Sequence, residues 1–488
     1  MWCNELAKQQ NHQGGEHLVS QKDGYVKSKI NKFDITNDKI SGRAGLVLIS
    51  RYLHESGITV FLAEQFGFLK KHAKGTPLIS IFHQIILFFF DGTDLHMTRF
   101  DHLKNDAGYA GIIETEKNIM ISSHTAKRFF NSISAVRVWL FRKILKQLFL
   151  WRLKIEKPDM IKIGIDTMVL DNNDANNREG VEPTYKKVKG FQPLQLYWGR
   201  YLIDAIFRNG KAHSNHGNHV QRIVTDIVKL IRTHYSNNVP IILLADTGFF
   251  DEKLFLVFDK LQIGFIVGGK MYKDIKDYID DLPDEQFYEY KKGKRSWFYC
   301  EFADKRKTWK QFWRTVFAKP ITEDDGQILL EYDRPENIIY TNLGMNNEIT
   351  SSILTLRSEG ETEISPQAII DSYHFRAKDE LVNRAFKDFG TEHIPFKRFT
   401  SNAAYYYLMA ISFLLFEAFK YDMDSKTIPI TWYAQTFRRK FIDIAGKITS
   451  RGRSRILNIP KAINASLDFA KLWNKSILVN QIRPQPTG

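Results

Sequence analysis

Cysteine is almost missing from this 488-residue chain, which contains only Cys3 and Cys300. Two cysteines cannot build a disulfide framework or supply the ligands of a structural zinc site. The sequence also has no set of histidines and cysteines with metal-ligand spacing. A reducing compartment is the simplest setting for such a chain, so we expect a cytoplasmic protein.

Long hydrophobic runs are missing too. The stretch from Met1 to Lys22 is polar, so no signal peptide is expected. Two apolar runs, residues 77–90 and 403–419, contain 14 and 17 residues. A membrane-spanning helix needs about 20 apolar residues. We therefore expect two buried core helices and no membrane partner.

A glycine-rich phosphate loop is absent as well, which argues against a nucleotide-driven motor. Acidic residues are outnumbered, because 55 Asp and Glu face 70 Lys and Arg, for a formal net charge of +15. A surplus of this size favours a polyanionic partner. Many basic proteins bind no nucleic acid, so charge alone does not identify that partner.

One predicted helix, between Ser365 and Gly390, carries four polar residues on a single face: Tyr373, Arg376, Glu380 and Lys387. At about 100° per residue, the last three lie at about 300°, 340° and 320° from the first. The carboxylate on such a stripe can hold a metal ion while the two cations hold phosphates. The alternative is a solvated helix face with an ordinary Arg–Glu ion pair.

Two aspartates stand at predicted strands. Residues 161–167 alternate in polarity and include Asp166, and the apolar run 240–245 leads directly to Asp246. A buried strand that delivers an acid at its C-terminal end has this pattern. Either aspartate alone could simply cap the helix that follows it.

Three carboxylates from distant parts of a chain suit phosphodiester cleavage. The attacking water must be activated and the charge on the leaving oxygen neutralised, and two divalent ions about 3.5–4 Å apart supply both functions. Magnesium or manganese suits a few carboxylates together with water and phosphate oxygens. Asp166, Asp246 and Glu380 are therefore candidate metal ligands.

The spacing Tyr-x2-Arg-x3-Glu-x6-Lys resembles the signature of DDE transposases of the insertion-sequence-4 type, and the chain from about residue 45 to 455 is most similar to the insertion-sequence-1380 group. The resemblance implies that Asp166, Asp246 and Glu380 are catalytic and bind Mg²⁺ or Mn²⁺. It implies that Tyr373, Arg376 and Lys387 contact DNA. A homodimer would cut at the terminal inverted repeats of a mobile element and join the 3′ ends to target DNA.

The resemblance also implies an α/β fold, with a ribonuclease-H-like catalytic core, a β-rich insertion and a helical N-terminal DNA-binding region. Periodicity itself predicts three strands, a helix, a strand, a helix and a strand over residues 161–268. The expected regions are the N-terminal helices (1–155), the first part of the core (156–280), the β-insertion (281–349), the second part of the core with the Glu helix (350–425) and a basic C-terminal region (426–488).

The expected insertion contains four strand-like runs, near residues 296–302, 312–318, 327–332 and 337–342. In the resembling family the insertion brings aromatic groups to the DNA near the cut. Trp297, Trp309 and Trp313 are therefore candidates for stacking on an unpaired base. The alternative is that these tryptophans form the core of a small β-domain.

Cations gather in the C-terminal region. Between residues 438 and 455 we expect phosphate contacts from five arginines: Arg438, Arg439, Arg451, Arg453 and Arg455. A solvated face or a dimer contact is the alternative. In the N-terminal region, the run from Ser122 through Lys127 and Arg128 is typical of either a DNA-recognition helix or an ordinary capped helix.

Two other classes of function remain open at this stage. One is a stand-alone metal-dependent DNA nuclease on the same fold, which would cut without joining strands. The other is a DNA-binding protein whose catalysis has been lost. For all three classes, DNA binding would associate this cytoplasmic protein with the nucleoid.

Overall fold

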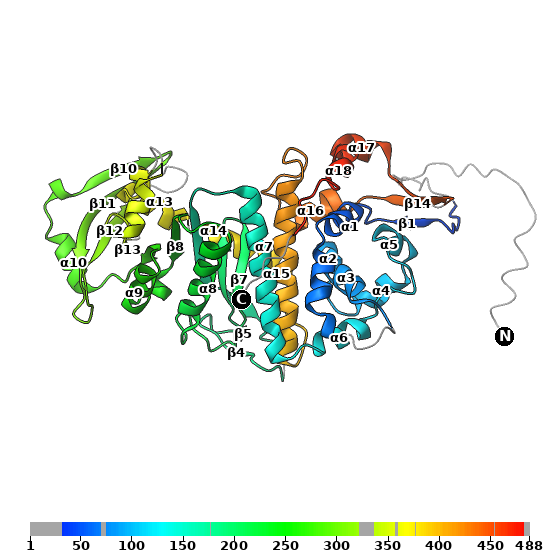
Figure 1. The fold of residues 1–488 in the computed structure, drawn as a ribbon, viewed down its shortest axis with the longest axis horizontal. Coiled ribbons are helices and arrows are strands. Elements are labelled where there is room, and N and C mark those ends of the chain that lie inside the picture. The colour runs from blue at the N-terminus through cyan, green and yellow to red at the C-terminus, as the bar shows by residue number, and fades with distance from the viewer. Residues whose placement is uncertain are drawn as a thin grey trace, which may run out of the picture. The chain divides into compact units, whose positions relative to one another are not determined.

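Figure 1 shows the computed structural model of the chain. It describes residues 32–69, 75–175, 177–321, 336–356, 360–375, 377–452 and 454–482, with the side chains of residues 360, 375 and 377–379 left out. Contacts divide the chain into two units, Met1–Asp38 and Lys39–Gly488. Residues 32–38 of the first unit form no helix or strand. Everything below concerns the second unit.

A mixed sheet of nine strands forms the centre of this unit. In spatial order the strands are β10 (Tyr288–Lys292), β11 (Arg295–Asp304), β12 (Trp313–Pro320), β13 (Asn337–Thr341), β9 (Gly264–Gly268), β8 (Ile241–Ala245), β2 (Ile161–Thr167), β6 (Leu194–Trp198) and β7 (Tyr201–Ile206). Strands β2, β8 and β9 are parallel to one another, and all other neighbours are antiparallel. The predicted α/β class is confirmed as a mixed α/β fold with a large mixed sheet.

The hydrophobic pattern of the sequence explains why these segments form the buried middle of the sheet. Every residue of β8 and of β9 is buried, as expected for parallel strands covered on both faces. Helix α8 (His219–His234) leads into β8, and α9 (Glu252–Lys260) connects β8 to β9. Apolar residues recur along α8 at helical spacing and all of them are buried. The alternation of strands and helices predicted for residues 161–268 is confirmed.

The strands expected as an insertion continue this same sheet. Strand β13 pairs antiparallel with β9, with Tyr340 opposite Val267, and β12, β11 and β10 follow outward. Three of the four expected runs correspond to β11, β12 and β13. The fourth, residues 327–332, lies outside the described residues. Because these strands extend the central sheet, their inner side chains share its core.

Helices α1 to α7 fill the N-terminal part of the unit, as the periodicity predicts. They are α1 (Leu46–Glu55), α2 (Ile58–Gln65), α3 (Leu78–Asp91), α4 (Arg99–Asn105), α5 (Ala107–Ile112), α6 (Ser123–Asn131) and α7 (Ala135–Glu156). Helix α7 runs beside α15 (Phe399–Asp422), which also packs against α3 and β7 (Figure 1).

Helix α15 is long and apolar enough to cross a membrane, and the bent pair α1–α2 passes the same test as one span. Inside the protein, however, 89% of the apolar window of α15 is buried. Burial of this kind is typical of the core helix of a globular domain. The two apolar runs expected as core helices are found as α3 and α15.

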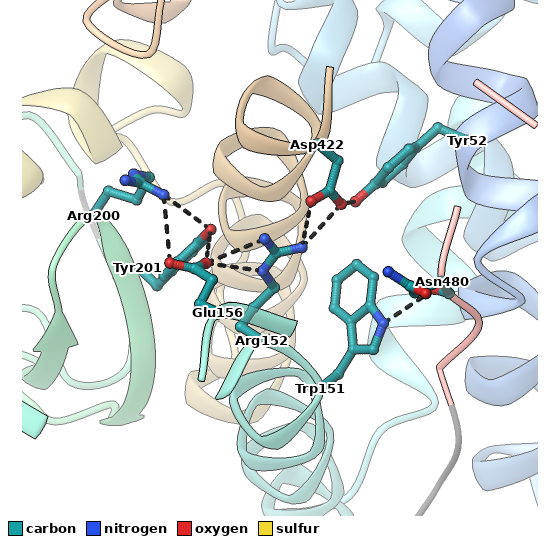
Figure 2. A network of polar contacts seen from close by, with 8 residues as sticks. All are labelled: Tyr52, Trp151, Arg152, Glu156, Arg200, Tyr201, Asp422 and Asn480. Atoms are coloured by element: carbon teal, nitrogen blue, oxygen red, sulfur yellow. Dashed lines mark hydrogen bonds and ion pairs between the residues drawn. The ribbon is translucent and has the colours of Figure 1, made fainter. Parts of the chain in front are cut away.

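A polar network ties α1, α7, β7 and α15 together (Figure 2). Arg152 of α7 has a fully buried side chain, and its Nη1 donates to both carboxylate oxygens of Asp422 at 2.9 Å. The Tyr52 hydroxyl donates to the same carboxylate at 2.7 Å. On its other side Arg152 pairs with Glu156, which accepts a hydrogen bond of 2.6 Å from Tyr201. A buried guanidinium satisfied in this way fixes the register of α7 against α15.

Two small sheets complete the fold. One joins β1 (Lys39–Ser41), β14 (Gly446–Arg451) and β15 (Ser454–Asn458), and the other joins β3 (Leu170–Asp171), β5 (Lys189–Phe191) and β4 (Glu182–Pro183). The remaining helices are α10 (Lys273–Asp280), α11 (Glu348–Leu354), α12 (Gly360–Glu363), α13 (Pro366–Phe375), α14 (Ala377–Phe389), α16 (Ala434–Phe437), α17 (Lys461–Leu467) and α18 (Phe469–Lys475).

Candidate active site

The two strand aspartates lie side by side at one edge of the sheet. Strands β2 and β8 are parallel neighbours with Ile165 opposite Ala245, so Asp166 on β2 is level with Asp246, which directly follows β8. Neighbouring strands are about 4.8 Å apart, and aligned residues on parallel strands point to the same face. Both aspartates are half-buried. The fold therefore brings together two carboxylates that are 80 residues apart in the sequence.

Each aspartate also accepts a hydrogen bond from a nearby backbone amide. Oδ1 of Asp246 accepts from the Gly248 amide at 2.9 Å and so caps a short 3₁₀ turn, residues 247–249. Oδ1 of Asp166 accepts from the Thr167 amide at 2.7 Å. Asp246 thus does cap the turn that follows it, which is the alternative role considered for these aspartates in the sequence analysis. These bonds fix one oxygen of each carboxylate and thereby the direction of the group.

The third acid, Glu380, is exposed on α14. One turn further along this helix, Asn383 donates from Nδ2 to Oδ2 of Asp166 at 2.8 Å. This bond fastens the helix that carries Glu380 to the strand that carries the first aspartate. We did not predict Asn383 from the sequence, although its position three residues after Glu380 places it on the same helix face.

Asn383 is the end of a longer polar chain. The Tyr197 hydroxyl contacts both Oδ1 of Asn383 and Oε1 of Gln195. Nε2 of Gln195 in turn donates to the Tyr406 hydroxyl at 2.6 Å. Since Gln195 and Tyr406 are fully buried, this chain anchors the Glu380 helix in the protein core through α15.

One tyrosine outside the predicted set is influenced by all three acids. Partial burial raises the pKa of Tyr185, whose side chain is otherwise exposed, and the negative charges of Asp166, Asp246 and Glu380 raise it further. All three carboxylates are therefore within electrostatic range of this one side chain. The sequence offered only a weak indication of this residue, namely the polar and basic character of residues 172–189.

The donor set at this edge suits a hard divalent cation, because it consists of carboxylate oxygens without cysteine or histidine. Among the described residues, no three acidic, histidine or cysteine side chains are already gathered closely enough to hold a metal ion. Asp166, Asp246 and Glu380 thus fit Mg²⁺ or Mn²⁺ by their chemistry, without forming a closed coordination sphere.

The helix expected to carry the quartet is described as two helices, α13 and α14, on either side of residue 376. Tyr373 on α13 lies beside the end of β9, since a β-carbon built on Gly268 would lie 2.6 Å from its Oη and 2.9 Å from Oγ1 of Thr247. Arg376 lies outside the described residues. Lys387 forms an ion pair of 2.7 Å with Glu392. The phosphate contacts expected of these residues stay predictions.

A family model described as Transposase DDE domain group 1 matches residues 25–477. The chain belongs to this family of DDE transposase domains. A cryo-EM structure of a piggyBac transposase synaptic complex with hairpin DNA is also similar, at 11% identity and a TM-score of 0.34, over 92% of this chain and 86% of that one. A TM-score this low does not establish a common fold. No curated protein matches the chain.

For two of the three tryptophans predicted to contact DNA in this DDE domain, burial contradicts the prediction. Trp313 is fully buried against Phe255 and Phe265. Trp297 is 4% exposed and stacks on His374. Neither ring presents a face on which a base could stack, so both are core aromatics, as the alternative interpretation held. Trp309 is half-buried, and its contact with DNA stays a prediction.

Arg438 also has a role other than the one expected. Its guanidinium donates to the carbonyl oxygens of Phe89 and Phe90 at the end of α3, and of Asp388 and Phe389 at the end of α14. Burial lowers its pKa to about 10. The expected phosphate contact is therefore corrected, because this side chain caps two helix C-termini.

The other basic residues of the C-terminal region are placed at the surface. Arg439 is exposed after α16, and Arg451 and Arg455 are exposed on the hairpin of β14 and β15. Arg453 lies outside the described residues. Exposure leaves these side chains able to reach phosphates, and that contact stays a prediction.

A basic groove of about 1040 Å³ runs between the segment after α14 and the N-terminal helices. Its charged lining residues are Asp94, Lys127, Asp174, Arg178, Lys397 and Arg398. The side chains of Lys127, Lys397 and Arg398 are exposed, and none of them forms an ion pair within the described part of the chain. Helix α6 contributes Lys127 and is capped by Ser122 as expected.

Proposed function

We propose that this protein is a DNA transposase that cuts at the ends of a mobile element and joins the 3′ ends to target DNA. The observation that carries the proposal is the edge of the sheet, where Asp166 and Asp246 end adjacent parallel strands and Asn383 fastens the Glu380 helix to Asp166. Membership of the DDE transposase domain family supports the same chemistry.

Asp166, Asp246 and Glu380 would hold Mg²⁺ or Mn²⁺, with Asp166 shared between two ions. Bound there, the ions would activate water and neutralise the leaving oxygen. The chain itself keeps these acids in place: Asn383 orients Asp166, and the Gly248 amide orients Asp246. Hydrolysis would free a 3′ hydroxyl at the element end, and that hydroxyl would then attack a phosphodiester bond of the target.

The finer assignments are proposals of the same kind. We propose a ribonuclease-H-like core, and the strand order β7-β6-β2-β8-β9, with β2, β8 and β9 parallel, supports it. We place the chain with the insertion-sequence-4 type and the insertion-sequence-1380 group on the spacing from Tyr373 to Lys387.

DNA would be held by several basic surfaces. We propose residues 1–155 as a DNA-binding region, which contributes α6 to the basic groove. We propose residues 426–488, which include the hairpin of β14 and β15, for DNA or dimer contacts. Two protomers would bring the two element ends together in one synaptic complex, and the protein would act in the cytoplasm, bound to the nucleoid.

The test uses a plasmid that carries the reading frame with its natural flanking DNA. Asp166→Ala, Asp246→Ala and Glu380→Ala should each abolish cleavage in Mg²⁺ while binding to the flanking DNA persists, because basic surfaces supply the binding. Asp280→Ala, which removes an exposed acid from α10, is the matched control. Wild-type cutting by any one of the three variants would remove that residue from the site.

The same assay separates the alternatives. Strand joining is measured by adding a pre-cut element end and a supercoiled target plasmid. Cutting without joining would identify a nuclease, and binding without either reaction would identify a catalytically silent DNA-binding protein. Cutting that continues undiminished in excess chelator would refute the proposed metal chemistry.

A further inference from the structure

Residues 168–193 form an excursion that leaves the central sheet at the edge where the acids lie. Strand β2 ends with Thr167 opposite Leu194, the first residue of β6. Everything between these two residues therefore departs from the sheet directly beside Asp166. Within the excursion, β3, β5 and β4 make their own three-stranded sheet.

Hydrogen bonds strap this excursion to the segment that follows the Glu380 helix. Nδ2 of Asn172 donates to the Glu392 carbonyl at 2.8 Å, and Oδ1 of Asn172 accepts from the Ile394 amide at 3.0 Å. Arg178 donates to the Ile394 carbonyl at 2.6 Å. These bonds hold the excursion to the chain that directly follows α14, the helix that carries Glu380.

The outer hairpin of the excursion, between β4 and β5, carries an aromatic and basic tip. Thr184 closes the turn, since both its amide and its hydroxyl donate to the Val188 carbonyl, at 2.9 and 2.8 Å. Tyr185, Lys186 and Lys187 project from this turn, and Tyr185 is 59% exposed. Neither lysine forms an ion pair with another residue of the described ranges.

The exposure, the charge and the position of the three tip residues indicate that they bind one and the same partner. The phenol of Tyr185 lies within the influence of all three acids, which together with burial raise its pKa. A phenol is protonated at neutral pH in any case, because its ordinary pKa is about 10, so it can donate a hydrogen bond. A DNA phosphate that approaches three carboxylates is repelled by them, and two unpaired ammonium groups nearby offset this repulsion.

We propose that the β4–β5 hairpin tip is a DNA clamp of the active site, in which Tyr185 donates a hydrogen bond to a phosphate oxygen beside the bond to be cut and Lys186 and Lys187 neutralise flanking phosphates. This inference rests on the proposed transposase function. It adds to the acids a substrate-positioning element that comes from a separate part of the chain.

The hydroxyl is tested with Tyr185→Phe, which removes a single oxygen from an exposed side chain. Cleavage of DNA already bound in excess protein should fall about 10- to 100-fold, as expected for a hydrogen bond to a charged group. Tyr278→Phe removes the same oxygen from an exposed tyrosine on α10 and should cut like the wild type. Cleavage within twofold of the wild type for Tyr185→Phe would overturn the role of the hydroxyl.

The lysines are tested by affinity for a labelled duplex of the flanking DNA at several salt concentrations. The double variant Lys186→Ala/Lys187→Ala should reduce the salt slope by roughly 0.9 for each lost phosphate contact. Lys229→Ala/Lys260→Ala removes equal charge from exposed positions on α8 and α9. It should leave the slope unchanged. Equal slopes for wild type and hairpin variant, or an equal reduction in the control, would refute the clamp.

These measurements separate the clamp from the proposed function. Binding is measured in Ca²⁺, so the salt slope tests the hairpin even if the wild type cuts no DNA. If the wild type cuts and joins while both hairpin variants match it, the clamp alone is wrong. If the wild type neither cuts nor joins but the hairpin slope falls as expected, the proposed reaction is wrong and the DNA contact stands.

Discussion

Replacement of Asn383 by alanine should uncouple the Glu380 helix from the first aspartate. The substitution removes a 2.8 Å hydrogen bond to the Asp166 carboxylate. It also removes the amide oxygen that the Tyr197 hydroxyl contacts. A hydrogen bond to a charged group contributes about 1.5–3 kcal/mol. Since Asn383 is only half-buried and Tyr197 keeps its contact with Gln195, we expect a stability loss of about 1.5 kcal/mol.

The effect on catalysis should exceed the effect on stability. A shift of about 1 Å in a reacting group can cost about 100-fold in rate, so cleavage by Asn383→Ala should fall about 10- to 100-fold while DNA affinity is retained. Asn383→Asp keeps the shape but places a fourth carboxylate against Asp166. It should cut more slowly still, because the new charge repels the aspartate that would hold the metal ions.

The assay combines urea unfolding with cleavage of pre-bound DNA over a range of Mn²⁺ concentrations. A positioning defect should raise the concentration of Mn²⁺ needed for half-maximal cleavage, whereas a purely structural defect should not. Arg384→Ala, a substitution of the next and exposed residue of α14, is the control. If Asn383→Ala folds stably and cuts within twofold of the wild type at every Mn²⁺ concentration, the reasoning is refuted.

Three further predictions concern stability. Gly268→Ala should destabilise the protein by about 1–3 kcal/mol and slow cleavage, because the new methyl group would lie 2.6 Å from Oη of Tyr373. Asp422→Ala should cost about 3 kcal/mol, since it leaves the buried Arg152 of Figure 2 with fewer partners. His83 is buried, and burial lowers its pKa from 6.5 to about 3. Below pH 6.5 His83 therefore binds a proton in the unfolded chain but not in the folded protein. From this group alone, the free energy of unfolding at pH 5 should be about 2 kcal/mol lower than at pH 7.

Urea unfolding monitored by circular dichroism checks all three. Gly42→Ala, where no atom lies within 4 Å of the added carbon and φ is not positive, separates crowding from the loss of glycine flexibility. Asp424→Ala removes a partly exposed carboxylate two residues from Asp422 and should destabilise the protein less than Asp422→Ala does. His83→Asn should abolish its share of the pH dependence. A pH profile unchanged by that substitution, or equal losses for Asp422 and its control, would contradict the assignments.

The sequence determined those features that depend on local pattern. Alternation and apolar runs marked β2, β8, α8 and α15, because side-chain periodicity records which face of an element is buried. The order Asp166, Asp246 and Glu380, with the spacing around Glu380, indicated the family before any contact was known. Parallel strands end at one edge, so the nearness of the two aspartates could also be expected.

Tertiary structure alone decided what each side chain faces. The same basic segment holds Arg438, half-buried as a cap on two helix ends, and Arg451, exposed on the surface of a hairpin. The aromatic side chain of Trp313 is of a kind that can stack on a base, but its environment is that of a core residue. Asn383 reaches Asp166 through a hydrogen bond across 217 residues of chain. The pKa of Tyr185 is influenced by acids from three separate segments. Periodicity shows that a face is buried or exposed, but the neighbour that covers it is chosen by the packing of distant segments, and no local pattern records that choice.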